Sequence, residues 1–324
     1  MPLEFFAQAD PPLELCSRTA ALAPENPFCT PSYLEARRAP GLRPWVLGLA
    51  TEERLVAACF AFLLAGRASR TLEIPSLPEM DGPNAFWDRL LVLCREEKVT
   101  YLDVDTYGSP HVEIPRLARE TGRSARWEYV LDLQESDSMR NVHVHHRRMI
   151  QRAHRHQLEM RQAANDQAGA DHVALMSASM RRRRLRGEDV PVESDAGSSM
   201  AYIRRGAGDL FQAVHGDRVL SSVLVLKAEQ GAYYQSAGTS VEGMACGASH
   251  FLVAEIASRL QRAGLRSFNL GGTRDPASGL ARFKSRFGAR VVKLESARFY
   301  VGAGYASMWL RTSALLLRKA ILSR

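Results

Sequence analysis

A short stretch of the chain, residues 267–288, brings cationic and aromatic side chains directly behind a strand-like segment. The residues 267–270 lead into Gly271 and Gly272, where a backbone without β-carbons can lie close to a ligand. The next ten residues, GLARFKSRFG, form a short helical pattern with a lysine and arginines on one face. Such cations can meet an acidic substrate or a developing oxyanion. We therefore expect a substrate site here, with both glycines in contact with substrate.

Lys284 is the strongest candidate for a catalytic role in this stretch. It lies between Phe283 and Phe287, and this pattern indicates that the helix packs over a site, with both rings against the substrate. Arg282 and the more distant Arg148 are candidate anion clamps, because a guanidinium binds a carboxylate or phosphate through paired hydrogen bonds.

An expected strand and the helix after it offer three further candidates. Tyr234 is in phase with Ser236, so both are expected to face the substrate, with the tyrosine as a proton donor or substrate contact. Core packing explains the tyrosine equally well. His250, near the start of the following helix, is a candidate base, and a histidine buried in the core or lying at the surface is the alternative.

The stretch 267–288 resembles the C-terminal signature of FemABX-type transferases and of related acyltransferases with a GNAT-like fold. That signature reads approximately F-D-L-G-G, a short spacer, then G-L-x-R-F-K-x-x-F-G, and Asn269 stands where the aspartate is usual. Residues 147–153 are similar to a second family segment, R-R-x-I-x-x-A. The resemblance covers roughly residues 140–300. It implies acyl transfer by a GNAT-like domain, in which Lys284 stabilises charge.

The segment 240–248 lies where GNAT enzymes bind the pyrophosphate of CoA through backbone N–H groups at a helix N-terminus. The usual pattern is R/Q-x-x-G-x-G/A, and Glu242 replaces its first residue with a carboxylate that would repel a pyrophosphate. Gly243, Gly247 and Ala248 still permit close approach to the backbone and are the candidate donor-binding residues. The donor is left open between an acyl-CoA and an aminoacyl-tRNA, and no tightly bound cofactor is expected.

Periodicity predicts the order of elements in the C-terminal half. Strands are expected at 158–161, 210–214, 219–226, 232–236, 267–270 and 289–299, and helices at 170–186, 196–205, 248–263 and 278–287. The N-terminal half repeats this order less distinctly, with strands at 3–7, 45–49, 55–64, 71–74, 101–104 and 126–133, helices at 31–38 and 85–97, and residues 114–121 before the last strand. We expect a mixed α/β (α+β) fold of tandem GNAT-like domains, each a mostly antiparallel sheet flanked by helices.

The expected domains follow the chain linearly. A degenerate GNAT-like domain spans 1–134, a basic helix connects it over 135–157, and a catalytic GNAT-like domain spans 158–300. The first domain has no copy of the signature, so we expect it to be structural or acceptor-binding. An amphipathic helix at 301–324 either docks on the protein itself or rests on an anionic membrane surface.

Composition narrows the class of protein. The 46% hydrophobic and 24% charged residues are ordinary for a soluble globular chain of 324 residues. The five cysteines are scattered and include no C-x-x-C pair, which argues against a disulfide framework or a zinc site and favours a reducing compartment. Without a secretory start or an apolar run near ~20 residues, we expect a cytoplasmic protein, with membrane association left open.

Charge is divided unevenly between the halves. Residues 1–134 carry a net charge of −5 and the remainder carries +13, so an anionic partner such as tRNA is expected at the C-terminal half. A solvated surface explains this charge equally well. The same choice applies to the arginine run 181–184, where we favour solvation over phosphate binding. Histidines at 143, 145, 146, 154 and 156 have metal-binding spacing, yet no acidic or sulfur ligand stands near them, so no metal site is expected.

These patterns and the resemblance together predict a cytoplasmic N-acyltransferase. It would move an activated acyl or aminoacyl group onto an amine of a small molecule or of a cell-envelope precursor. No Ser-His-Asp or Cys-His pattern is evident, so no covalent enzyme intermediate is expected. Two alternatives remain: a CoA-dependent N-acetyltransferase of a small amine, and a non-catalytic binding module that uses the same basic surface.

Overall fold

The computed structural model describes residues 3–39, 41–52, 54–66, 69–80, 83–134, 141–188 and 196–302, which form a mixed α/β fold. They belong to two compact units whose segments alternate along the chain. Unit 1 contains the described parts of 1–12, 39–125 and 295–324, and unit 2 contains those of 13–38 and 126–294. These limits do not coincide with the linear boundaries expected at residues 134 and 158, because an N-terminal segment joins unit 2 and the last strand ends in unit 1.

Unit 1 is a mostly antiparallel sheet with a helix packed on it. Its strands are, in order, β1 (Glu4–Ala9), β2 (Leu42–Ala50), β3 (Leu55–Ala65), β4 (Arg70–Ile74), β5 (Tyr101–Asp105) and the end of β12 (Arg290–Tyr300), and β4 and β5 form the parallel pair. Helix α3 (Pro83–Glu96) buries Phe86, Trp87 and Leu90 in the core of this sheet. Residues 114–119 form no helix, and Arg119, with a φ of 65°, leads into β6 (Glu120–Asp132).

Within the described residues, unit 2 contains six further strands. Its strands run in the order β6, β11 (Ser267–Thr273), β10 (Gly231–Thr239), β9 (Arg218–Lys227), β8 (Gly208–His215) and β7 (Glu159–Ala163). Alternation of side chains along β8 and β9 supplies a core on each face of this sheet. Tight turns join β8, β9 and β10 into the expected antiparallel meander.

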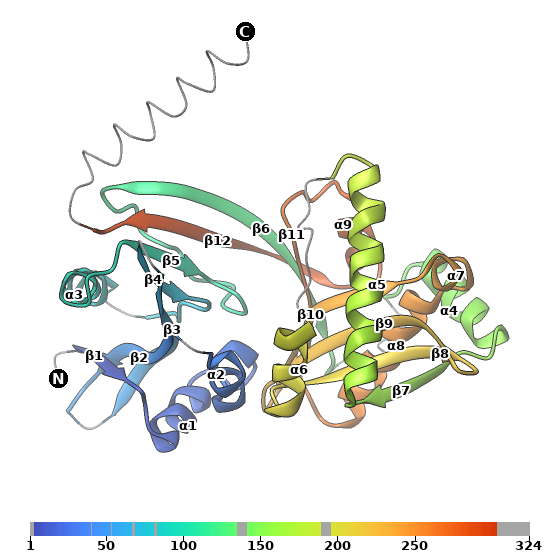
Figure 1. Cartoon of the computed structure of the whole chain (residues 1–324), viewed down its shortest axis with the longest axis horizontal. Helices are drawn as coiled ribbons and strands as arrows, with labels where there is room; N and C mark the ends of the chain where they lie inside the picture. Colours follow the sequence, from blue (N-terminus) through green and yellow to red (C-terminus); the bar gives the residue numbers. More distant parts are fainter. Residues whose placement is uncertain are drawn as a thin grey trace, which may run out of the picture. The chain divides into compact units, whose positions relative to one another are not determined.

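Helices cover both faces of the unit 2 sheet. Helices α5 (Asp166–Leu185) and α6 (Ala196–Arg204) pack on one face, and α4 (Val144–Arg155) and α8 (Ala248–Arg262) are part of the core on the other. Figure 1 shows α5 running across the strands with α8 behind them. Shorter helices complete the unit: α1 (Leu13–Ala21), the 3-10 turn η1 (Pro27–Cys29), α2 (Pro31–Arg37), α7 (Val241–Cys246) and α9 (Gly279–Ser285).

The position of the site is set by two strands that separate. Strands β10 and β11 pair in parallel only over Gly231–Tyr233 and Ser267–Asn269. Beyond that point each has a register irregularity, between Tyr234 and Ser236 in β10 and between Asn269 and Gly272 in β11. The two strands therefore diverge at the residues that the sequence signature singled out.

The expected order of elements is confirmed in both halves, with three differences. Helix α1 and helix α7 were not predicted. The connecting helix was expected over 135–157, of which 135–140 lie outside the described residues, and within the described part α4 begins at Val144. The last strand of each half pairs in the other half's sheet: β6 pairs with β11, and β12 pairs with β5.

The remaining expectations concern the cysteines and the C-terminal end. All five cysteines are buried thiols that form no disulfide with one another. The amphipathic helix expected at 301–324 lies almost wholly outside the described residues. Within the described part of the chain, no helix combines the length and apolar character required to cross a bilayer.

Candidate functional site

Lys284 lies in the interior of unit 2, where β10 and β11 diverge. Helix α9 begins at the Ser278 cap, whose hydroxyl accepts a hydrogen bond from the Ala281 N–H, and this helix directs the lysine inward. The side chain is 5% exposed, and its Nζ donates a hydrogen bond of 3.2 Å to the carbonyl of Gly272. Nζ also lies 5.8 Å from the centre of the Tyr234 ring. The phenylalanines beside this lysine correctly indicated that it is not an exposed surface residue.

The glycine pair makes room for protein side chains. Gly271 has a φ of 73°, and a β-carbon there would lie 3.4 Å from Lys284 Nζ and 3.0 Å from the carbonyl oxygen of Tyr234. A β-carbon on Gly272 would lie 2.4 Å from Nε of Arg126. The space beside each glycine is thus occupied by the lysine or the arginine, and direct contact of the glycines with substrate stays a prediction.

A buried carboxylate stands beside the lysine. Glu128, on β6, is 1% exposed and accepts hydrogen bonds from the Tyr233 hydroxyl at 2.7 Å and from Nδ2 of Asn269 at 2.6 Å. Nη2 of Arg126 lies 3.3 Å from the same carboxylate. Asn269 in turn accepts the Gly271 N–H at 2.8 Å. Asn269 stands where the signature has an aspartate, and the carboxylate of Glu128, 141 residues earlier in the chain, lies directly beside it.

This environment shifts the pKa of Lys284 from 10.5 to about 7. Burial is the largest cause, because a charged ammonium loses its hydration inside the fold. The positive charges of Arg126 and Arg183 lower the pKa further, and the negative charge of Glu128 raises it. Near neutral pH the lysine can therefore either donate a proton or accept one.

The arginine run at the end of α5 reaches the same region. Nη2 of Arg182 donates to the hydroxyl of Ser179 at 2.9 Å and to the carbonyl of Thr239 at the end of β10. Arg183 pairs with Glu188 at 2.7 Å, and its charge acts on Lys284. Both arginines are partly buried, so the interpretation of the whole run as a solvated cluster is wrong for these two.

Tyr234 and Ser236 do not share a face as predicted, because the bulge between them breaks the strand alternation. The Tyr234 ring packs against the core that includes α8, and burial raises the pKa of its hydroxyl. Ser236 instead bonds to Nε2 of His172 on α5 at 2.9 Å. Tyr234 remains next to Lys284, whereas Ser236 belongs to a different set of contacts.

His172 is a buried residue that sequence reasoning missed. It is fully buried, and its two ring nitrogens contact the hydroxyls of Ser222 and Ser236, each at 2.9 Å. Burial lowers the pKa of this histidine to about 4, so the ring is neutral near pH 7. It ties α5 to β9 and β10 directly beside the diverging strands.

The remaining predicted residues lie on α4, α8 and α9. His250 packs against Phe283 with ring centres 5.0 Å apart, and burial lowers its pKa to about 3. Phe283 and Phe287 contact each other at 5.2 Å. Arg148 and Arg282 are exposed, and neither side chain has a hydrogen bond or ion pair to another described residue. Contact of His250 and the two arginines with Lys284 is not observed among the described residues.

The predicted donor-binding glycines are packed against the protein's own backbone. A β-carbon on Gly243 would lie 2.4 Å from the carbonyl oxygen of Leu220, and one on Gly247 would lie 2.4 Å from that of Met149 on α4. Ala248 is 0% exposed. Glu242 is exposed and pairs with Arg218 at 2.9 Å. The role of these residues in donor binding therefore stays a prediction. The space beside Gly243 and Gly247 is already filled by backbone carbonyl groups of the protein itself.

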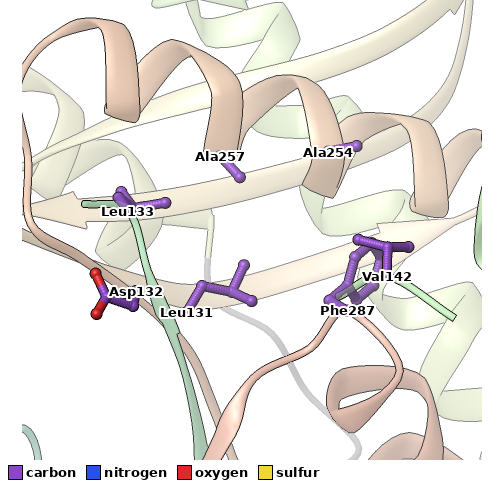
Figure 2. Close-up of a pocket in the computed structure, with 7 residues that line it drawn as sticks. All are labelled: Leu131, Asp132, Leu133, Val142, Ala254, Ala257 and Phe287. Atoms are coloured by element: carbon purple, nitrogen blue, oxygen red, sulfur yellow. The ribbon is translucent and has the colours of Figure 1, made fainter. Parts of the chain in front are cut away.

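A small apolar cavity lies beneath α8. Figure 2 shows its lining, which comes from the end of β6, from α8, and from Val142 and Phe287. Its volume is about 20 Å³, enough for roughly one water molecule. This cavity is too small to hold a substrate.

Comparison with known proteins identifies the fold. Residues 140–285 match the family model described as an acetyltransferase (GNAT) domain. No curated protein matches the chain in sequence. The crystal structure of FemX is similar, with a TM-score of 0.67 and 12% identity over 89% of this chain and 96% of FemX.

Two further solved structures are similar over nearly their whole length. A tandem GNAT protein from the clavulanic acid biosynthesis pathway has a TM-score of 0.58 and 13% identity, over 94% of this chain and 100% of that one. The C-terminal domain of a putative lysylphosphatidylglycerol synthetase from Agrobacterium fabrum has a TM-score of 0.54 and 13% identity, over 94% and 96% of the two chains. The predicted tandem GNAT-like fold is thereby confirmed, and residues 140–285 match a GNAT acetyltransferase domain.

Proposed function

Because residues 140–285 match a GNAT-type acetyltransferase domain and the chain is similar in fold to FemX and to a tandem GNAT protein, we propose that this protein is an N-acyltransferase. It transfers an activated acyl or aminoacyl group to an amine acceptor at the point where β10 and β11 diverge. The observation that carries the proposal is Lys284, which is buried at that point with a pKa of about 7 and is surrounded by further charged groups.

The proposed reaction needs few groups from the protein. The nitrogen of the acceptor amine attacks the carbonyl carbon of the donor, and a C–N bond forms as negative charge moves to the carbonyl oxygen. Protonated Lys284 donates a hydrogen bond to this oxyanion, whose negative charge in turn raises the pKa of the lysine. When the intermediate collapses, the bond to the leaving group breaks, and the proton from the amine passes to the leaving group. Tyr234, next to the lysine, is the proposed relay for that proton.

The packing of the donor loop favours a donor other than CoA. A pyrophosphate bound at the start of α8 would need backbone space, but Gly247 lies directly against α4. Glu242 adds negative charge at the start of α7. We therefore propose an aminoacyl-type donor such as aminoacyl-tRNA, for which the +13 half and Arg183 supply positive charge.

A cell-envelope precursor is the proposed acceptor. The support is fold likeness to FemX and to the C-terminal domain of a putative lysylphosphatidylglycerol synthetase. We propose that the acceptor binds in the cytoplasm, as the five scattered cysteines without a C-x-x-C pair suggested. The second candidate, a CoA-dependent N-acetyltransferase, is supported by the family match, since GNAT domains generally use acyl-CoA donors.

Calorimetric titration with acetyl-CoA separates the two donors. We expect no binding at micromolar concentrations, and tight stoichiometric binding would overturn the proposed aminoacyl donor. Turnover is then measured as amine-dependent release of the amino acid from charged tRNA. Lys284→Met should reduce this rate at least ~100-fold, the loss seen when one oxyanion donor is removed, while the exposed-lysine control Lys293→Met should not change it. Equal rates in both variants would overturn the proposed role of Lys284, and binding without any turnover in the unchanged protein would favour a non-catalytic binding module.

A further inference from the structure

Three histidines from two helices meet beside the rings of Phe283, in α9, and Phe287, just after that helix. His145 and His146 lie at the start of α4, and His250 lies near the start of α8. One ring nitrogen of each lies within 4.8 Å of those of the other two. The rings of His146 and His250 are 4.4 Å apart between centres, and both contact Phe283. This histidine cluster has no part in the acyl-transfer chemistry proposed above.

The hydrogen bonding of His146 leaves one nitrogen free for a ligand. The ring is 2% exposed, and its Nε2 lies 2.9 Å from the carbonyl oxygen of Phe283. A carbonyl can only accept, so Nε2 carries the proton and Nδ1 carries a lone pair. That Nδ1 is buried and has no hydrogen-bond partner among the described residues.

His250 lies beside His146 with a similar unpaired ring nitrogen. Its Nδ1 is also buried without a described hydrogen-bond partner. Leaving a buried polar atom unsatisfied is costly, and native proteins rarely do so. Two such atoms on neighbouring rings point to a shared ligand that accepts lone pairs. A metal cation meets this requirement, whereas another hydrogen-bond acceptor would not.

We propose that His145, His146 and His250 bind one divalent transition-metal ion of the zinc type. Three imidazoles with an open fourth position are a known ligand set for Zn²⁺. Metal-binding histidines commonly donate their second ring N–H to a carbonyl or carboxylate, which fixes the tautomer of the ring. His146 makes such a hydrogen bond to the Phe283 carbonyl. Zn–N bonds of 2.0–2.1 Å place ligand nitrogens about 3.3 Å apart, so the rings must close by roughly 1 Å or more on binding.

The ligand atoms of the cluster select the class of metal. The three described ligands are all imidazole nitrogens, and no carboxylate belongs to the group. Oxygen-seeking ions such as Mg²⁺ and Ca²⁺ are therefore excluded, while imidazole suits Zn²⁺, Co²⁺, Ni²⁺ and Cu²⁺.

The bound ion would connect three helices. His145 and His146 belong to α4, His250 belongs to α8, and the Phe283 carbonyl belongs to α9 next to Lys284. Metal binding would hold these helix ends together and so support the helix that carries the lysine. The inference goes beyond the proposed acyl transfer and does not depend on it.

Metal titration of the full-length protein tests the site. After treatment with a chelator, the protein is titrated with Zn²⁺ in a calorimeter and with Co²⁺ in a visible absorption spectrometer. We expect one ion per chain, a Co²⁺ spectrum of tetrahedral type, and a rise in Tm on adding Zn²⁺. His145→Ala is the primary variant, because this ring is exposed and its removal leaves the fold intact. It should weaken binding at least ~10-fold.

Two further variants test whether metal binding depends on the histidine cluster. His250→Asn should abolish the one-to-one binding, with circular dichroism used to confirm that the chain is folded. His154→Ala removes a histidine from the same helix that lies outside the cluster, and it should bind metal as the unchanged protein does. Failure of the unchanged protein to bind Zn²⁺ or Co²⁺ at micromolar concentrations would overturn the proposal. Binding that is lost with His154→Ala but kept with His145→Ala would do the same.

Discussion

Replacing Lys284 by methionine should raise the free energy of unfolding at neutral pH. This gain over the unchanged protein should become smaller as the pH rises. The side chain of methionine has a similar length and no charge, so it suits a position that is 5% exposed. The lysine is buried with its pKa lowered from 10.5 to about 7, chiefly by burial. Each pKa unit corresponds to about 1.4 kcal/mol, so charging this lysine in the fold costs at most roughly 5 kcal/mol.

The direction of the pH effect follows from proton binding. Between pH 7 and 10.5 the unfolded chain keeps the lysine protonated while the folded chain has lost the proton. Stability must therefore rise with pH across this window, by about 1.4 kcal/mol per pH unit, and below about pH 7 the full cost is present. Lys284→Met removes the cost and also the hydrogen bond to Gly272, which contributes about 1 kcal/mol. The net gain near pH 6 is thus about 3–4 kcal/mol.

Urea unfolding of both proteins at several pH values measures this difference. Subtracting the two free energies of unfolding cancels every group except Lys284, and the difference should shrink by about 2 kcal/mol between pH 7 and pH 9. Lys293→Met, at an exposed position, should show no such trend. A difference that stays constant with pH would refute the reasoning, because it would mean that the lysine has an ordinary pKa in the folded chain.

Three other substitutions test the surroundings of the site by urea unfolding. Asn269→Asp should destabilise the protein by about 1–3 kcal/mol at pH 8, because it sets two carboxylates side by side, and adding Glu128→Gln should restore stability. If Glu128→Gln failed to restore stability, the pairing of position 269 with Glu128 would be contradicted. His172→Phe should cost about 2–4 kcal/mol by leaving two buried hydroxyls without the ring. No change in the free energy of unfolding would mean that water bonds to the two hydroxyls in place of the histidine ring. Gly247→Ala should cost about 2 kcal/mol or more at its φ of 85°, whereas Gly279→Ala, with open space around it, should be near neutral. Equal effects would show that Gly247 is not closely packed.

Sequence periodicity predicted most of the elements because their apolar faces are continuous. It missed α1, although Leu15, Cys16 and Thr19 are buried at helical spacing directly after a proline pair. It also missed α7, a helix of only six residues that begins at a serine cap. The pairing of β6 and β12 in each other's sheets could not be predicted, because strand partners are set by contacts far apart in sequence.

The candidate site was predicted only where its residues are neighbours in the chain. Lys284 and its phenylalanines form a local pattern, and local patterns are readable from one sequence. Glu128 reaches the lysine through the pairing of β6 with β11, and nothing in its own segment indicates a buried carboxylate. The histidine cluster shows the same limit, since the absence of nearby ligands in sequence did not reveal His250 on α8.

The departure at position 269 illustrates how such long-range contacts change the meaning of a motif. On its own, Asn269 weakens any proposal for an acidic group at the site. In the fold it donates to Glu128 at 2.6 Å, a geometry in which a second carboxylate would be repelled. The asparagine is therefore the residue that a carboxylate at position 128 requires, and the site keeps its negative charge on a different strand. That charge opposes the effect of burial on the pKa of Lys284, so the side chain at position 269 and the protonation of the lysine are linked through Glu128.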